Sequence, residues 1–350
     1  MKWEENIRKV TPYTPGEQPD DPRVIKLNTN ENPYPPSPEV LKALQSITET
    51  QLRKYPDPTV SDLIAAISKE YQMPEEQIFV GVGSDDVLAM IFLTCFHSNK
   101  PILFPDITYS FYDVWAELFG IPYEVQPLSE DFLIRTSDYK GENGGVIFPN
   151  PNAPTGIALP LEQIEEIIQA NQEVVCVIDE AYIDFGGTSA RSLIKKYDNL
   201  LVVQTFSKSR ALAGMRIGYC FGSERLIQYL NDVKFSFNSY TMNVAAIQSG
   251  IASIRDKDYF NKCVSAIIQT REWAKKELTQ LGFHCLESSS NFLFVSHERH
   301  AAKQIFTYLK AHHIYVRYFD KPRIDNYLRI TVGTDHEMKQ LMVVLREYLQ

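Results

Sequence analysis

The sequence is poor in cysteine and has no long apolar run, and both shortages narrow the class of protein. Its thiols are odd in number, widely spaced and form no Cys-x-x-Cys pair, so we expect reduced core thiols and a cytoplasmic location. They are Cys95, Cys176, Cys220, Cys263 and Cys285. The N-terminus has no apolar segment typical of a secretory signal, and no stretch approaches the ~18 apolar residues of a membrane span. We therefore expect neither export nor a membrane partner.

Positive charge is also in the minority. Lysine and arginine total 35 against 44 aspartates and glutamates, a formal charge of -9, which argues against nucleic acid as a partner. No phosphate-binding P-loop motif is present, and Gly81-Val-Gly83-Ser-Asp-Asp86 lacks the third glycine of a dinucleotide fingerprint. His297 and His300 could share a helix face but have no evident third ligand, so we expect no metal site.

What is present is ordinary globular composition in a chain long enough for two domains. Of 350 residues, 44% are hydrophobic and 23% charged. Residues 1–27 are rich in proline and predict an N-terminal arm that packs on something. We place a large domain at residues 28–237 and a small C-terminal domain, which packs with the N-terminal segment, at residues 238–350.

Continuous apolar runs in the large domain predict strands buried on both faces. They lie at residues 78–82, 102–104, 145–148, 174–178 and 200–204. Helical segments are expected at 38–48, 59–71, 109–119 and 160–170, and another begins at Ser84, which we take as its N-cap. The small domain is expected to hold a helical stretch to about 281, broken near Asp256, then strands at 291–295, 314–317 and 327–332 among further helices. The fold class is therefore α/β: a mostly parallel sheet wrapped by helices, plus a smaller α+β domain.

Two of the predicted strands end at or just before a residue that could take part in catalysis or bind a cofactor. Asp179 ends the run Val174–Ile178, and Lys208 follows the run Leu200–Gln204 in a segment rich in small residues. Taken alone, such an aspartate more often caps a helix and such a lysine is more often solvated. Together with Arg216 and the helix start at Ser84, they match the needs of pyridoxal phosphate: a lysine to hold it, an acid for its ring nitrogen, and donors for its phosphate.

This set resembles the fold-type I aminotransferases of class I/II, and the resemblance covers nearly the whole chain. Ser-Lys…Leu-Ala-Gly-x-Arg-x-Gly at 207–218 and Asp-Glu-Ala-Tyr at 179–182 are typical of that superfamily. Asn-Glu-Asn-Pro at 30–33, Lys-Tyr-Pro-Asp at 54–57 and Thr-Pro-Tyr at 11–13 make the chain most similar to the histidinol-phosphate aminotransferase branch.

The resemblance implies a role for each matching residue. Lys208 would carry the cofactor and shuttle the proton, Asp179 would pair with the ring nitrogen, Tyr182 would bind the ring oxygen and Tyr109 would stack on the ring. The phosphate would be held by Ser84, the backbone of Asp85, Ser207 and Arg216, and by Tyr55 from the neighbouring subunit of a homodimer. The substrate would be bound by Tyr13 on the partner's arm, Asn291, Arg317 and Arg329.

One position departs from the family pattern. The stretch Asn-Pro-Asn-Asn-Pro-Thr-Gly is usual, and its second adjacent asparagine contacts the ring oxygen, whereas this chain has Ala153 there. Either Asn152 or Tyr182 alone covers that oxygen, or the contact is lost.

The implied activity is transfer of an amino group from L-histidinol phosphate to 2-oxoglutarate, giving imidazole acetol phosphate and glutamate, in histidine biosynthesis. An aromatic amino-acid aminotransferase and a threonine-phosphate decarboxylase would use the same cofactor residues. A non-catalytic regulator of this fold would need an added DNA-binding segment, and the resemblance already begins near residue 11.

Overall fold

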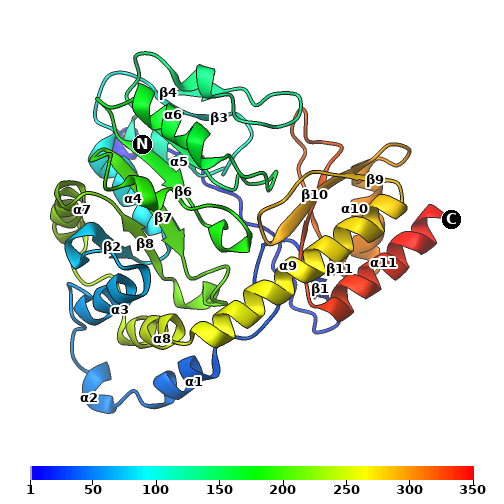
Figure 1. Ribbon diagram of the computed structural model, residues 1–350, viewed down its shortest axis with the longest axis horizontal. Coiled ribbons are helices and arrows are strands. Elements are labelled where there is room, and N and C mark those ends of the chain that lie inside the picture. The colour runs from blue at the N-terminus through cyan, green and yellow to red at the C-terminus, as the bar shows by residue number, and fades with distance from the viewer. Residues whose placement is uncertain (1) are drawn as a thin grey trace.

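A computed structural model describes residues 2–350 and shows two bodies joined by one long helix (Figure 1). The larger body is built on a seven-stranded sheet with the order β2-β8-β7-β6-β5-β3-β4. Only β8 runs antiparallel to its neighbours. The strands are β2 (Ile78–Gly81), β3 (Ile102–Pro105), β4 (Tyr123–Gln126), β5 (Gly145–Pro149), β6 (Cys176–Asp179), β7 (Leu200–Thr205) and β8 (Gly218–Phe221). The expected mostly parallel sheet is confirmed.

The central strands are buried on both faces, which explains their continuous apolar runs. Alternate residues enter different cores: in β6, Cys176 and Ile178 belong to one cluster and Val177 to the other. In β7, Leu200 and Val202 lie in the first core, and Leu201 and Val203 in the second. Successive side chains of a strand point to opposite faces of the sheet, so each central strand contributes to both hydrophobic cores.

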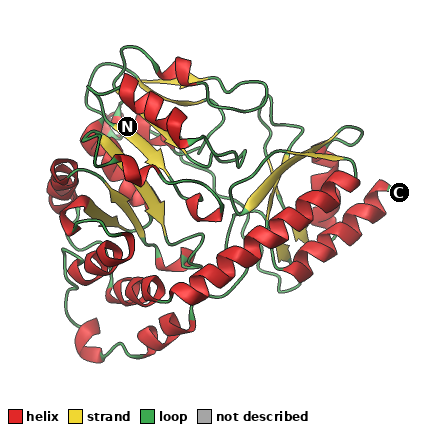
Figure 2. Ribbon diagram, viewed as in Figure 1, coloured by secondary structure: helices red, strands yellow, loops and turns green. Residues whose placement is uncertain are grey.

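Helices cover both faces of this sheet (Figure 2). Buried side chains of α3, α6 and α8 join the first core, and those of α4, α5 and α7 join the second. The helices of this body are α1 (Pro38–Gln45), α2 (Glu49–Leu52), α3 (Ser61–Tyr71), α4 (Ser84–Cys95), α5 (Tyr112–Phe119), α6 (Leu161–Ala170), α7 (Glu224–Phe237) and α8 (Val244–Arg255).

The smaller body holds a four-stranded antiparallel sheet in the order β12-β13-β10-β9. Its elements are β9 (Phe283–Cys285), β10 (Phe292–His297), α10 (Ala302–Ala311), β11 (Ile314–Tyr315), β12 (Arg317–Tyr318), β13 (Leu328–Thr331) and α11 (Asp335–Leu349). The N-terminal strand β1 (Ile25–Lys26) pairs with β11, in parallel. The N-terminal segment thus completes the smaller body, and the expected single strand at 314–317 is two short strands in different sheets.

The helix α9 (Lys257–Gln280) joins the two bodies, and Asp256 caps its start. The expected break near Asp256 is confirmed. The chain leaves the large body later than residue 238, because α8 still packs on α1 and α3 and buries Ile247 and Ile254 in the first core. The change of partner therefore falls along α9.

Three local expectations need correction. The strands β4 and β8 were not expected: β4 is mostly exposed, and β8 lies in a glycine-bearing segment. Gly83, not Ser84, is the N-cap of α4, because its φ of 88° turns the chain and leaves Ser84 as the first helical residue.

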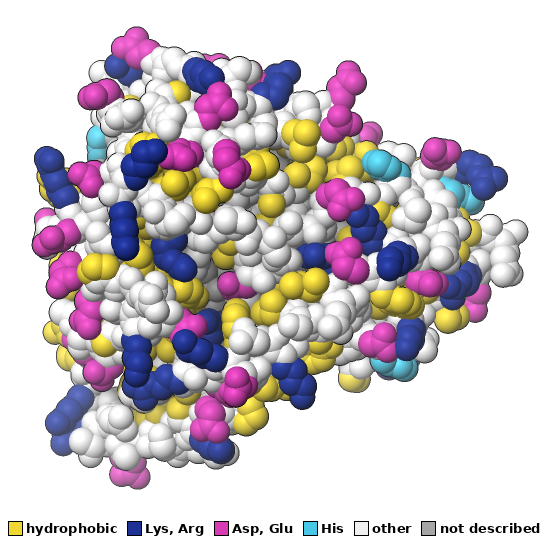
Figure 3. Space-filling view, viewed as in Figure 1, with side chains coloured by type: hydrophobic (Ala, Val, Ile, Leu, Met, Phe, Trp, Pro, Cys, Tyr) yellow, Lys and Arg dark blue, Asp and Glu magenta, His cyan; other side chains and the backbone are white. Residues whose placement is uncertain are grey.

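Charges of both signs are interspersed over the face drawn in Figure 3. Within residues 2–350, no helix has the length and apolar character needed to cross a membrane.

Candidate active site

A cavity of about 180 Å³ lies where the loops after β3, β5, β6 and β7 meet the N-terminal segment and the smaller body. Its position beyond the carboxyl ends of parallel strands is where α/β sheets bind ligands. It is lined by Tyr13, Gly16, Asn28, Thr29, Asn30, Thr108, Tyr109, Ser110, Ala153, Pro154, Tyr182, Lys208, Arg317, Phe319 and Arg329. Six of the residues predicted from the sequence thus line one space.

Lys208 reaches this cavity because β7 ends at Thr205, just before it. Its ammonium donates a hydrogen bond to the backbone oxygen of Thr29 at 3.2 Å and lies 5.7 Å from the centre of the Tyr182 ring. Among residues 2–350, no carboxylate forms an ion pair with Lys208. The Lys208 amine is therefore held by a single hydrogen bond to a neutral backbone oxygen.

Asp179 ends β6 and is only 4% exposed. The Tyr112 hydroxyl donates to its carboxylate at 3.0 Å, and the Ala181 N–H donates at 3.3 Å. Burial raises the pKa of Asp179 to about 6, against the weaker opposing effect of these hydrogen bonds. Among residues 2–350 no lysine or arginine forms an ion pair with it, so a cationic ring nitrogen would supply a missing countercharge.

The start of α4 forms a cup suited to a phosphate. No side chain of the described residues caps this helix, so its first N–H groups are free for an anion. Two glycines keep the cup open: a Cβ at Gly218 would lie 2.3 Å from the Ser84 nitrogen, and one at Gly83 would lie 2.5 Å from the Arg216 guanidinium. The structure thus brings Ser84 and Arg216 together. Ser207, whose hydroxyl accepts a hydrogen bond from Thr205 at 3.0 Å, follows the neighbouring strand.

The Asp85 carboxylate links the start of α4 to Tyr109, the residue predicted to stack on the cofactor ring. Arg216 forms an ion pair with Asp85 at 3.1 Å, and the Tyr109 hydroxyl donates to the same carboxylate at 2.7 Å. Asp85 was predicted only through its backbone, so its side-chain role is a finding of the structure.

The predicted substrate arginines approach from the smaller body, on β12 and β13. Arg329 donates to the backbone oxygen of Asn28 at 3.0 Å, while its buried Nε has no partner among the described residues. Burial lowers the pKa of Arg329. Asn291 is fully buried and donates to the backbone oxygen of Asn30 at 3.0 Å, leaving its Oδ1 unpaired. Arg329 thus offers an unpaired donor at the cavity, whereas Asn291 is not among the residues that line it.

The two predicted partner-subunit tyrosines behave differently. Tyr13 was expected from the partner's arm, but it lines the cavity of its own chain, where its ring stacks on Phe111 at 4.1 Å. The arm folds back over α5, as the Arg8 hydrogen bond to the Leu118 oxygen shows. Tyr55 is not brought to this cavity: it is 83% exposed and packs against Tyr240.

The sequence left two candidate donors to the cofactor ring oxygen, Asn152 and Tyr182, and the structure places them differently. The Asn152 amide nitrogen donates to the Ile107 oxygen and to Thr155, at 3.0 and 3.2 Å, and its oxygen accepts from Thr108. Asn152 is therefore committed to the loops and does not line the cavity, whereas Ala153 and Tyr182 do.

Sequence reasoning missed Tyr112 and Asn30. Tyr112 follows Tyr109 by three residues, and the two rings meet edge to face with their centres 5.8 Å apart. Asn30 belongs to Asn28-Thr-Asn30-Glu-Asn32, a run of asparagines next to proline that lies outside any predicted element. Such a run directly after the arm is the signal that could have drawn attention to Asn30.

These residues fit pyridoxal phosphate. Lys208, lightly held, and the buried Arg329 guanidinium with a free donor line the cavity, and Asp179, a buried carboxylate without an ion pair in the described chain, interacts with the charge of Lys208. The uncapped start of α4 is linked to the cavity because Asp85 pairs with Arg216 and accepts from Tyr109. Each supplies what one part of that molecule or of an anionic substrate requires.

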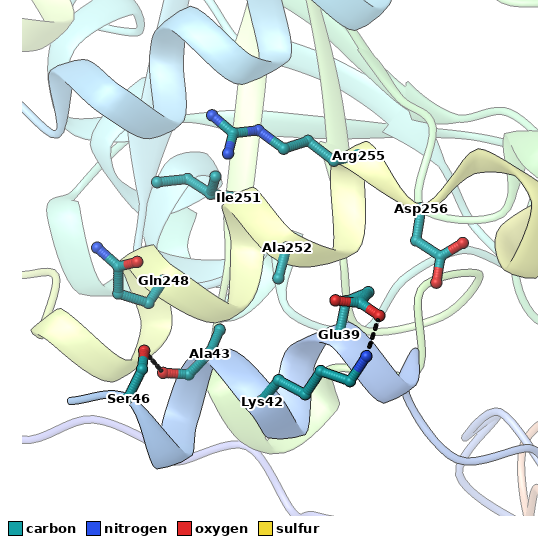
Figure 4. A pocket seen from close by; sticks show the side chains of 9 residues that line it. All are labelled: Glu39, Lys42, Ala43, Ser46, Gln248, Ile251, Ala252, Arg255 and Asp256. Carbon is teal, nitrogen blue, oxygen red and sulfur yellow. Dashed lines mark hydrogen bonds and ion pairs between the residues drawn. The ribbon is translucent and has the colours of Figure 1, made fainter.

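A second hollow, of about 570 Å³, lies between α1 and α8 (Figure 4). Three of its four charged side chains are already engaged, since Lys42 pairs with Glu39 at 2.7 Å and Asp256 accepts from Ser37 at 2.5 Å. It lies on the outer side of the large body.

Comparison with known proteins supports the chemical argument. Residues 22–345 match the family model of aminotransferase class I and II. The chain is 51% identical to the histidinol-phosphate aminotransferase of Clostridium beijerinckii, over 98% of this chain and 96% of that protein. It is 49% identical to that of Lactococcus lactis subsp. cremoris, over 100% and 98%.

Solved structures share the fold. Histidinol-phosphate aminotransferase from Clostridium acetobutylicum has a TM-score of 0.86 at 21% identity, over 93% of this chain and 99% of that one. The Sinorhizobium meliloti enzyme in complex with pyridoxal-5'-phosphate has a TM-score of 0.83 at 24% identity, over 93% and 90%. The expected fold and cofactor class are confirmed. This chain belongs to the class I and II aminotransferases, and within them to the histidinol-phosphate aminotransferases.

Proposed function

We propose that this chain transfers the amino group of L-histidinol phosphate to 2-oxoglutarate, giving imidazole acetol phosphate and glutamate. The observation that carries this assignment is one cavity lined by Lys208 and two arginines, with the buried carboxylate of Asp179 close enough to interact with the charge of Lys208. Relatives about half identical over nearly the whole chain carry this activity in their names.

The cofactor-holding residues come from different strand ends of the large body. Lys208 would hold pyridoxal phosphate covalently, and Asp179 would face its ring nitrogen. Ser84, the Asp85 backbone, Ser207 and Arg216 would bind its phosphate at the start of α4. When bound, this cofactor supplies an electron sink for the negative charge that develops on the carbon carrying the amino group.

The chain's own part in the reaction is to move one proton and to orient the substrate. Lys208 Nζ, once released by the incoming amine, would take the proton from the amino-bearing carbon and return it on the cofactor side. Its contact with the Thr29 oxygen keeps the amine within the cavity. Asp179 is kept dry by burial, and a positive ring nitrogen facing it would favour its ionised form.

The substrate's anionic end would be bound by Arg317 and Arg329. Arg329 is buried beneath Phe292 and Phe319, its guanidinium carbon lying 5.3 and 5.6 Å from their ring centres. An arginine in such a dry setting gives a strong, directed contact with phosphate or carboxylate. One pair of arginines can thus serve both the amino donor and 2-oxoglutarate, and Tyr13 would cover the pocket.

We further propose a homodimer in which Tyr55 completes the phosphate site of the other subunit. Tyr55 packs against Tyr240, and further exposed apolar side chains lie close to these two in the sequence, an exposure that water disfavours. The four side chains are Leu52, Tyr55, Phe237 and Tyr240, at 67%, 83%, 70% and 47% exposure. The free state of all five cysteines supports a reducing compartment, and we place the reaction in the cytoplasm.

The dimer proposal has a direct test by subunit mixing. Lys208→Ala removes the reacting amine and Tyr55→Phe removes the cross-subunit donor, so each homodimer should be impaired. A mixed dimer should contain one intact site and regain activity. No regain on mixing, or a fully active monomer in sedimentation, would refute shared sites.

The substrate assignment is tested by comparing amino donors. Histidinol phosphate should convert the lysine-bound cofactor faster than phenylalanine does, and amino transfer should require a keto acid. Preference for phenylalanine would indicate an aromatic aminotransferase. Carbon dioxide release from threonine phosphate without a keto acid would indicate a decarboxylase.

A further inference from the structure

Four of the five residues in the N-terminal segment 28–32 contact the central groups of the site. The Arg329 guanidinium donates to the Asn28 oxygen and the Lys208 ammonium donates to the Thr29 oxygen. The Asn30 amide donates to the Tyr182 hydroxyl at 2.9 Å, and the Asn32 amide donates to the Lys208 backbone oxygen at 3.0 Å. This segment therefore touches the substrate arginine, the lysine and the ring-oxygen tyrosine at once.

Within this segment, Asn30 is buried, and hydrogen bonds fix both its backbone and its side chain. It is 1% exposed, and its φ of 57° lies in the left-handed region, where asparagine is tolerated. Its N–H donates to the Thr331 hydroxyl at 3.0 Å, and that hydroxyl donates back to the Asn30 side-chain oxygen at 3.1 Å. Thr331 thus fixes which end of the amide is oxygen, and the amide nitrogen must face Tyr182.

The direction of this hydrogen bond decides what Tyr182 can do. A phenolic hydroxyl has one proton, and here its oxygen accepts from Asn30. Its proton is therefore free to be donated into the cavity. Ala153 has no donor, and both Asn152 amide contacts are made elsewhere.

We propose that Asn30 is a positioning residue that aims the Tyr182 proton at the ring oxygen of the cofactor. Tyr182 is then the sole side-chain donor to that oxygen from this chain. This inference rests on the proposed function, because it presupposes bound pyridoxal phosphate.

The consequence is measurable in the spectrum of the loaded protein. A donor to the ring oxygen stabilises its negative charge, so the proton held next to that oxygen is released at lower pH. A hydrogen bond worth about 1 kcal/mol corresponds to a shift of roughly one pH unit. The other charged or titratable groups that interact with Tyr182 are Lys208, Arg329, Tyr109 and Tyr112.

The test is a pH titration of the absorbance of the cofactor-loaded protein. Asn30→Asp keeps the size of the side chain but offers an acceptor, which would capture the Tyr182 proton. The transition should move upward by about one pH unit. Asn326→Asp, an equally small change at a residue whose oxygen accepts from the Ala302 N–H, is the matched control and should titrate as the unmodified protein does.

A double variant separates the effect of the Tyr182 hydroxyl on the titration from the effect of the negative charge introduced at position 30. In a Tyr182→Phe background, Asn30→Asp should add no further shift, because its route through the hydroxyl is gone. An equal shift in both backgrounds would overturn the proposal, since the new charge alone would then account for it. An unchanged titration in a folded Asn30→Asp protein would also overturn it.

Ala153→Asn provides a variant that does not disturb the buried network. A second donor should lower the transition pH and should partly reverse the effect of Asn30→Asp. No change would overturn the claim that Tyr182 is the sole donor. Failure of the proposed function is distinguishable, because the unmodified protein would then show no absorbance band that Lys208→Ala removes.

Discussion

The guanidinium of Arg216 lies 3.1 Å from the carboxylate of Asp85 at the first turn of α4, where the site would hold a phosphate. Both side chains are about two-fifths exposed, so the pair itself contributes little stability. Its value lies in orientation: Arg216 is held across Gly83, and Asp85 also accepts from Tyr109.

Arg216→Gln should weaken cofactor binding while leaving the fold intact. Hydrogen bonds to charged groups are worth about 1.5–3 kcal/mol, which predicts a loss of about 10- to 100-fold in affinity. Equilibrium dialysis of pyridoxal phosphate measures it. Arg346→Gln, at an exposed ion pair on α11, is the control and should bind the cofactor normally. Equal affinity in both variants would remove Arg216 from the phosphate site.

Lys208→Ala should abolish the absorbance of lysine-bound cofactor and lower amino transfer by at least about 10²–10⁴-fold, the usual contribution of a positioned acid–base group. Single-turnover mixing with histidinol phosphate measures the rate. Lys339→Ala, an exposed helix lysine paired with Asp335, should change neither quantity. Retained transfer without Lys208 would contradict the assignment of the proton shuttle.

Asp179→Asn should stabilise the cofactor-free protein at pH 8 and weaken cofactor binding. A carboxyl whose folded pKa is raised above its unfolded value makes the folded state less stable as pH rises. Burial raises this pKa from 3.8 to about 6, so the cost develops between those values and is full above pH 6. Two pH units correspond to about 3 kcal/mol.

Chemical denaturation of the cofactor-free Asp179→Asn protein at two pH values checks the sign. The variant should be more stable than the parent at pH 8, and the difference should fade near pH 4. A variant less stable at pH 8 would show that the ionised carboxylate is well solvated or paired. Loss of cofactor affinity in the same variant is the second expected result.

Arg329→Lys should raise KM for both amino donor and keto acid. A lysine keeps the positive charge but loses the planar fork that binds an anion through two parallel hydrogen bonds. An effect of about 10- to 100-fold is expected from the loss of one charged hydrogen bond. Steady-state kinetics would show it, and an effect confined to kcat would argue against a binding role.

Arg323 should hold the two bodies together. From the segment before β13 it donates to Asp106 at 2.9 Å and to the backbone oxygens of Leu128 and Ser129 at 2.9 and 2.7 Å. Arg323→Ala should lower the free energy of unfolding by about 1–3 kcal/mol and raise KM, because Arg329 follows on β13. Unchanged stability and KM would show that other packing holds the bodies together.

Much of the site could be predicted from the sequence because each key residue follows a recognisable strand. Asp179 and Lys208 end buried apolar runs, and parallel strands deliver their carboxyl ends to one edge. The N-cap of α4 was misplaced by one residue, since only the positive φ of Gly83 shows where the helix begins. Strand β4 was missed because it is an edge strand with three of its four residues exposed, and Tyr123–Gln126 forms no continuous apolar run.

The sequence alone determined the sheet of buried strands, the cofactor class and the order of its ligands, because strand ends and local motifs depend on neighbours in the chain. Only the tertiary structure decided which groups meet across long separations. Asn30 meets Tyr182, 152 residues away, and Thr331, 301 residues away, because β1 joins the smaller body and carries the next segment into the cavity. A hydrogen bond's direction depends on that surrounding network, which no local pattern records.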